Sequence, residues 1–179
     1  MEKYKYEFIF KNSKNPDELF DAFDNALKEG VDDIEVYKLL FWNPALDINM
    51  LSMFVKKLAS SFPNIAYDVY MWGAKVIELS FDNVENYETI LNFYKKAADL
   101  KPLENEPYIK AVDAYNFELK IHPPAAVINF LKKGITKVKD PSTLYFKLSE
   151  FFGKLGNSEL KNHYLSEGEK YLRRKFGGE

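Results

Sequence analysis

One amphipathic helix pattern recurs along this chain, and this recurrence constrains the fold more than any other feature of the sequence. In each copy the apolar residues lie three and four positions apart, while lysine and other polar residues fill the opposite face. The copies begin near Leu19, Leu51, Ile90 and Val127, so that successive copies lie 32, 39 and 37 residues apart. A period of about 20–50 residues indicates stacked helical units, each of which covers its neighbour.

The segments between these copies follow a second pattern with the same period. Large apolar residues stand at its first and last positions, and small or apolar residues stand between them, where two helices would approach closely. Within each copy of the first pattern, a large apolar residue also marks the middle position: Phe23, Val55, Tyr94 and Leu131. The second pattern comprises Tyr37–Leu40–Phe41, Val69–Trp72–Gly73–Val76, Tyr108–Ala111–Val112–Tyr115 and Tyr145–Leu148–Ser149–Phe152.

This arrangement resembles the tetratricopeptide repeat over residues 17–172. Gly73 and Ser149 stand where that family prefers glycine, and Pro63 and Pro102 stand at the repeat boundary. The resemblance implies an all-α, right-handed helix–turn–helix solenoid of about four helix pairs with an extra N-terminal helix. Longer connections before Asn86 and Pro124 leave open a half-tetratricopeptide array or another helical solenoid.

We expect a single domain over residues 1–179, because no segment is long or polar enough to be a linker. The opening residues allow two interpretations. Tyr4, Tyr6, Phe8 and Phe10 alternate as in a strand, but no partner strand is evident, which favours a truncated opening helix. The repeat register places the units at residues 17–63, 64–102, 103–140 and 141–176.

Composition excludes several classes of function. The chain has no cysteine, which excludes disulfides, thiolate zinc sites and cysteine nucleophiles. It has no uncharged apolar run of about 18 residues, and its first residues do not resemble a secretory signal. We therefore expect a cytoplasmic protein with no membrane partner.

The resemblance also implies a groove lined by residues of the first helix of each pair. Aromatic anchors flanked by charges would take a peptide or a helix of a partner protein, which makes the chain an interaction scaffold and not an enzyme. The other interpretation is that the same aromatic residues are core, covered by the N-terminal segment or by a second copy in a homodimer. The candidate groove residues are Lys38, Trp42, Tyr70, Met71, Ile109, Lys110, Asp113, Phe117, Phe146, Lys147 and Glu150.

Two alternative functions carry less weight. Residues 1–123 hold 14 Lys and Arg against 21 Asp and Glu, and residues 124–179 hold 11 against 6, so the basic C-terminal part could contact RNA or another nucleic acid. The acidic remainder disfavours this function. Glu118 with His122 and Glu159 with His163 could begin a metal site for a helical enzyme, but a site needs three or four ligands. No catalytic motif is present, and the sequence predicts no cofactor and no metal.

Overall fold

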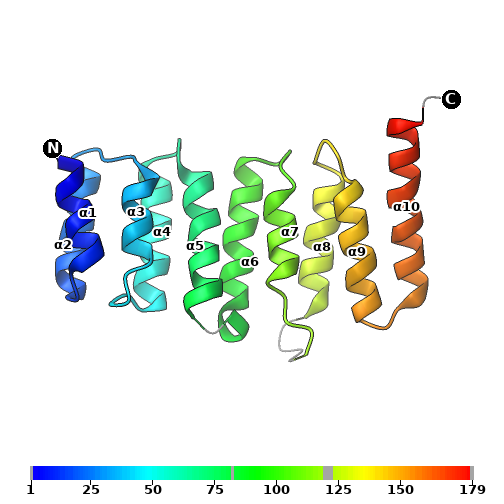
Figure 1. The fold of residues 1–179 in the computed structure, drawn as a ribbon, viewed down its shortest axis with the longest axis horizontal. Coiled ribbons are helices and arrows are strands. Elements are labelled where there is room, and N and C mark those ends of the chain that lie inside the picture. The colour runs from blue at the N-terminus through cyan, green and yellow to red at the C-terminus, as the bar shows by residue number, and fades with distance from the viewer. Residues whose placement is uncertain (1, 82, 119–122, 178–179) are drawn as a thin grey trace. The chain divides into compact units, whose positions relative to one another are not determined.

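The chain is all-helical in the computed structural model, which describes residues 2–81, 83–118 and 123–177 (Figure 1). Its contacts group into two compact units, Met1–Asn86 and Tyr87–Glu179. The described residues form ten α-helices and no strand, which confirms the predicted all-α fold class. The helices are α1 (Glu2–Asn12), α2 (Pro16–Lys28), α3 (Ile34–Phe41), α4 (Ile48–Ser61), α5 (Ala66–Ser80), α6 (Asn83–Leu100), α7 (Glu106–Asp113), α8 (Pro124–Ile135), α9 (Ser142–Lys154) and α10 (Ser158–Phe176).

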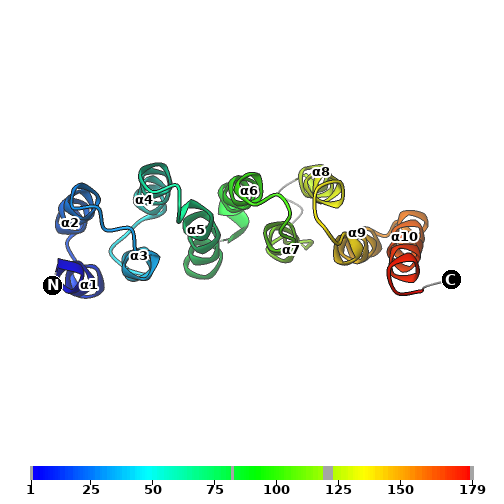
Figure 2. The ribbon, with the colours of Figure 1, turned by 90° about the horizontal axis from the view of Figure 1, so that it is seen from above.

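The first unit is built from α1 to α5, which pack in two rows. Helix α1 packs on α2 and α3, α2 on α4, and α5 on both α3 and α4, so the rows are α1 with α3 and α2 with α4 (Figure 2). Residues 2–12 are helical, which confirms the opening helix and excludes the strand. Because α1 packs on α2, the chain begins with a complete helix pair. Tyr6 and Phe10 are the buried side chains of α1.

Local sequence signals place the helix ends of this unit. The side chain of Asn15 accepts a hydrogen bond from the Asp17 amide, and Pro16 fills the first helical position of α2, where no amide donor is needed. The Asp47 carboxylate accepts a bond from the Met50 amide and so caps α4. Gly30 follows α2 with a φ of 74°, a conformation that favours glycine.

Aromatic rings fill much of the core of the first unit. The ring of Phe23 lies 4.4 Å from that of Phe54 and 5.9 Å from that of Tyr37, and Phe10 lies 6.0 Å from Tyr37. All four side chains are fully buried. The Tyr37 hydroxyl donates to the carbonyl oxygen of Val31 at 2.6 Å, so this buried polar group is satisfied. The aromatic content of the sequence is thus partly explained by helix packing.

The second unit contains α7 to α10 together with α6 from Tyr87 onward. Helices α7, α8 and α9 pack on one another, and α10 packs on α9. The Tyr87 hydroxyl donates to the carbonyl oxygen of Ala111 at 2.7 Å, which joins α6 to α7. Where α10 meets α9, the Phe146 ring lies against Gly168, and a Cβ there would come within 2.7 Å of the ring. Gly168 is therefore a packing position within the helix.

Polar contacts between helices recur at the period of the sequence repeat. Lys57 bonds to Asp24, Lys133 to Asp99 and Lys147 to Asp113, over separations of 33, 34 and 34 residues. Each lysine belongs to the later helix pair and each aspartate to the earlier one. Further contacts with separations of 30 to 35 residues join Asn43 to the carbonyl oxygens of Phe10 and Ser13, and Lys175 to Asp140. Equivalent positions of neighbouring pairs are therefore linked directly.

Gly73 lies at a close approach between α5 and α4, as its position in the repeat predicts. A Cβ at this residue would lie 2.6 Å from a methyl carbon of Val55, which is fully buried. Any larger residue would push the two helices apart.

We predict that Gly73→Ala lowers the free energy of unfolding by about 1 kcal/mol, because overpacking outweighs the gain in helix propensity. Gly153→Ala in α9 is the matched control, since its nearest neighbour is the flexible side chain of Lys161, 3.2 Å from the added Cβ. Urea unfolding of both variants provides the comparison. Equal free energies of unfolding for Gly73→Ala and Gly153→Ala would show that α4 and α5 leave room for the added methyl group.

Candidate functional site

A hollow in the second unit, of about 130 Å³, brings several predicted groove residues together. Its walls come from α7 and the segment that follows it on one side, and from α9 on the other. Asp113, Phe117, Lys147 and Glu150 were all predicted from the sequence to face a groove, and all four line the hollow. The complete lining is Val112, Asp113, Tyr115, Phe117, Lys147, Glu150, Phe151 and Lys154.

Three aromatic rings of the lining contact one another. The centroid of Phe117 lies 4.9 Å from that of Tyr115 and 4.7 Å from that of Phe151, and Tyr115 lies 5.2 Å from Phe151. Tyr115 and Phe151 are buried, whereas Phe117 is half-buried. Burial raises the pKa of the Tyr115 hydroxyl, so the group stays neutral. Of this cluster only Phe117 is partly exposed, and the accessible lining of the hollow is more polar than apolar.

Charged groups in the lining are held in fixed positions. The Lys147 ammonium lies 2.8 Å from the Asp113 carboxylate and 3.9 Å from that of Glu150. The Lys154 ammonium lies over the Phe117 ring, 4.8 Å from its centroid. The two cations and two anions balance, so the hollow offers oriented charges without a strong net field.

The first unit has a second cluster of predicted residues, centred on Trp72. The ammonium groups of Lys38 and Lys75 lie 4.5 Å and 4.7 Å from the centroid of this ring, and Trp42 meets it edge to face at 6.4 Å. Trp42 is 41% exposed. The Trp72 indole Nε1 is buried and has no hydrogen-bond partner among the residues that the structure describes. The sequence placed Trp72 in a helix seam and not in the groove, although its separation of 34 residues from Lys38 matches the repeat period.

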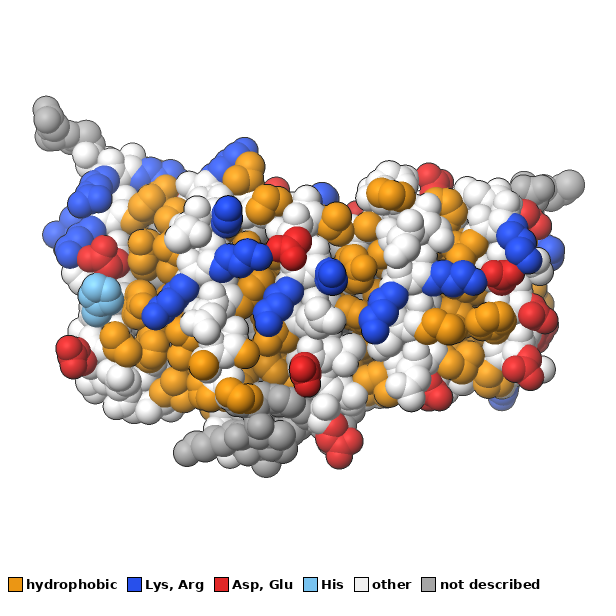
Figure 3. Space-filling model, turned by 180° about the vertical axis from the view of Figure 1, so that it is seen from behind, with side chains coloured by type: hydrophobic (Ala, Val, Ile, Leu, Met, Phe, Trp, Pro, Cys, Tyr) orange, Lys and Arg blue, Asp and Glu red, His pale blue; other side chains and the backbone are white. Residues whose placement is uncertain are grey.

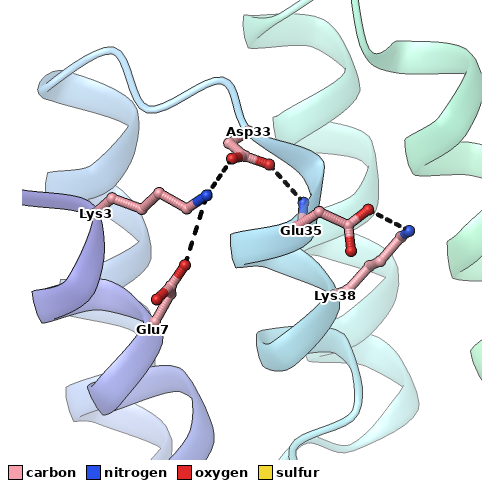
Figure 4. Close-up of polar contacts among 5 residues, drawn as sticks. All are labelled: Lys3, Glu7, Asp33, Glu35 and Lys38. Carbon is pink, nitrogen blue, oxygen red and sulfur yellow. Dashed lines mark hydrogen bonds and ion pairs between the residues drawn. The ribbon is translucent and has the colours of Figure 1, made fainter.

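A polar network lies beside this cluster, at the N-terminus of α3 (Figure 4). One oxygen of Asp33 accepts a hydrogen bond from the Glu35 amide at 2.9 Å, and the other pairs with the Lys3 ammonium of α1. Lys3 also lies 3.7 Å from Glu7. Glu35 in turn bonds to Lys38 at 2.6 Å, which holds Lys38 beside Trp72. The bonds from Lys3 and from the Glu35 amide hold the pKa of Asp33 below its usual value.

The other predicted groove residues do not line the hollow. Ile109 and Lys110 are on α7, half-buried and exposed, and Tyr70 and Met71 are half-buried on α5. Burial raises the pKa of Tyr70. Phe146 is half-buried against Gly168 of α10, which makes it a packing residue of that helix pair.

Sequence reasoning did not single out two residues that shape these clusters. Phe151 follows the predicted Glu150 directly, and its ring contacts both Phe117 and Tyr115. Lys75 lies one turn beyond Met71 and contacts Trp72. Phe151 is distinguished by its contact with the segment after α7, whereas Lys75 is distinguished only by its contact with Trp72 of the same helix.

Several cations of the basic C-terminal part form ion pairs within the chain. Lys133 pairs with Asp99 and Arg173 with Glu169. Figure 3 shows lysine and arginine side chains interleaved with hydrophobic and acidic ones on the face turned away from the viewer of Figure 1. This face would therefore present cations, anions and hydrophobic side chains together to a nucleic acid.

Among the described residues, no group of three or more His, Asp or Glu side chains could hold a metal ion. His163 is exposed beside Tyr164. Of the other predicted pair, Glu118 is exposed, and His122 lies outside the described residues. Within the same part of the chain, no helix is long and apolar enough to cross a membrane.

The helical arrangement is that of a tetratricopeptide-like repeat fold, and comparison with solved structures supports this class. Two crystal structures of MamA are similar to the chain. One has a TM-score of 0.54 at 13% identity, covering 99% of this chain and 97% of that one. The other has a TM-score of 0.53 at 13% identity, covering 90% and 91%. At this identity the likeness concerns the fold alone. No family model and no curated protein matches the sequence.

We predict that Asp33→Asn leaves stability at neutral pH nearly unchanged, because asparagine caps helices equally well and an exposed ion pair contributes little. Asp33→Ala should cost about 1 kcal/mol, since the cap is lost. The contribution of the ionised Asp33 is complete above its unfolded pKa of 3.8 and is lost as the pH falls through the lower folded value. As the pH is lowered below 3.8, the free energy of unfolding of Asp33→Asn should therefore fall less steeply than that of the parent protein. The same pH dependence of unfolding in the parent and in Asp33→Asn would contradict the network around Asp33.

Proposed function

We propose that this chain is a protein-interaction scaffold that binds a peptide or a helix of a partner protein at the hollow between α7 and α9. The observation that carries the proposal is the combination of one partly exposed aromatic ring, Phe117, with oriented charges in one hollow. A hollow of this volume holds a single apolar side chain of a ligand. The charges of Lys147 and Glu150 would then orient the polar backbone and side chains on either side of that anchor.

The energetics of binding favour such a preformed site. Phe117 is already packed against Tyr115 and Phe151, so that little side-chain freedom remains to be lost when a ligand binds. Lys147 is likewise held by two carboxylates. Aromatic side chains commonly supply most of the binding energy of protein interfaces. We propose no reaction for this site, because the arrangement accounts for holding a ligand and for nothing more.

The test is selection of binding peptides from a displayed random library on the full chain. We predict that selected peptides share an apolar residue flanked by charged ones, and that Phe117→Ala weakens their binding at least tenfold. Phe20→Ala is the matched control, since this ring is also half-exposed and lies beneath a lysine, Lys57, at 5.7 Å, but is remote in sequence from the hollow. It should leave binding unchanged.

Thermal melting separates binding from folding in this experiment, because Phe117 packs against two neighbouring rings. Lys154→Ala provides a second variant of the same site, in which only the charge above Phe117 is removed. Peptides that bind the Phe117→Ala protein as tightly as the parent would refute the site. A steep loss of binding to single-stranded RNA with rising salt, without any selected peptide, would favour the nucleic-acid alternative.

A further inference from the structure

The charges that line the hollow between α7 and α9 differ at its two ends. Lys147, Glu150 and Lys154 follow one another along α9 at intervals of three and four residues, so they lie on one side of the helix. Asp113 of α7 joins this row at the Lys147 end, where its carboxylate lies 2.8 Å from the ammonium. At the other end the Lys154 ammonium lies over the Phe117 ring. One end of the hollow is therefore mixed in charge and the other is cationic.

The mixed end carries net negative charge. Lys147 lies between two carboxylates, 2.8 Å from that of Asp113 and 3.9 Å from that of Glu150, so its one positive charge offsets one of two negative charges. Asp113 is the closer partner. The Lys147 side chain is 26% exposed, whereas the Glu150 side chain is 66% exposed. Glu150 is therefore the anion of this end that a ligand can reach most readily.

Glu150 and Lys154 do not pair with each other, although their spacing favours a pair. A glutamate four residues before a lysine is the arrangement that stabilises a helix best by an ion pair. Glu169 and Arg173 of α10 have this spacing and do pair, at 3.4 Å. Lys154 instead forms no ion pair with any described residue, and its ammonium lies 4.8 Å from the centroid of the Phe117 ring. This cation–π contact leaves a separate negative and a separate positive charge beside the ring.

We propose that Glu150 and Lys154 select the ligand by the order of its charges, an inference that rests on the proposed peptide binding at the hollow. The preferred peptide carries a basic residue that pairs with Glu150 and an acidic residue that pairs with Lys154. These two residues stand on opposite sides of the apolar residue that contacts Phe117. A peptide of the same composition with its two charges exchanged brings like charges together at both ends of the hollow, which opposes its binding.

The test is selection of peptides from a displayed random library on the full chain and on an exchange variant, Glu150→Lys with Lys154→Glu. Peptides selected on the parent should share one charge order around an apolar residue, and those selected on the exchange variant should share the reverse order. A peptide selected on the parent should bind the exchange variant about tenfold more weakly, because two attractions become repulsions. Rising salt concentration should reduce this difference, since salt screens exposed charges.

Glu169→Lys with Arg173→Glu is the matched control, because these residues form an exposed pair of the same spacing on α10 and do not line the hollow. Both exchanges leave the net charge of the chain unchanged. Peptides selected on the control should keep the charge order of the parent. Circular dichroism melting tests whether each variant is folded. If the exchange in α9 prevents folding, Glu150→Gln and Lys154→Gln replace it, since each should remove the preference for one of the two ligand charges.

The results that overturn this selection by charge differ from those that overturn peptide binding itself. The same charge order on the parent and on the exchange variant, or no common order on either, would show that Glu150 and Lys154 do not select the ligand. The hollow would still be the binding site if Phe117→Ala weakened the binding of those peptides. A parent protein that selects no peptide would refute the binding site and the selection together. A reversed order on the control would show that contact at the hollow does not set the order.

Discussion

The contact between one helix pair and the next is the interaction on which the rest of this structure depends. It has an apolar part, in which Val55 meets Gly73, and a polar part, in which lysines such as Lys147 bond to aspartates about one repeat earlier. The apolar part supplies most of the stabilisation, because exposed ion pairs contribute little. The polar part fixes which residues of the two pairs lie opposite each other. Both parts recur at the period seen in the sequence.

The candidate site arises from the same contact. Between α7 and α9 the chain places Asp113 opposite Lys147, as at other seams, but the segment after α7 turns Phe117 toward Phe151. These aromatic rings line one part of the hollow, and the ion pair between Asp113 and Lys147 lines another part. The contact that aligns these neighbouring helices thus also provides oriented charges beside one partly exposed aromatic ring, Phe117.

Much of the fold could be predicted from the sequence because burial follows the helical period. Val55 and Leu131 were placed in the core by spacing alone, and both are fully buried. The site was harder to predict, since it depends on contacts between helices. Phe146 shares its phase with Tyr70 and was assigned to the groove, but the absence of a side chain at Gly168 allows its ring to pack on α10. Phe151 shows the converse, a ring whose partners Tyr115 and Phe117 come from the segment that follows α7.

We infer that each helix pair is stabilised by its immediate neighbours, as is typical of repeat proteins. Amide hydrogen exchange of Gly168→Leu tests it most directly, because a larger residue there collides with Phe146, whose ring lies 2.7 Å from an added Cβ. The account predicts faster exchange in α9 and α10, with protection in α1 to α3 unchanged. An equal rise in exchange rate in every helix would contradict the account and indicate one cooperative core.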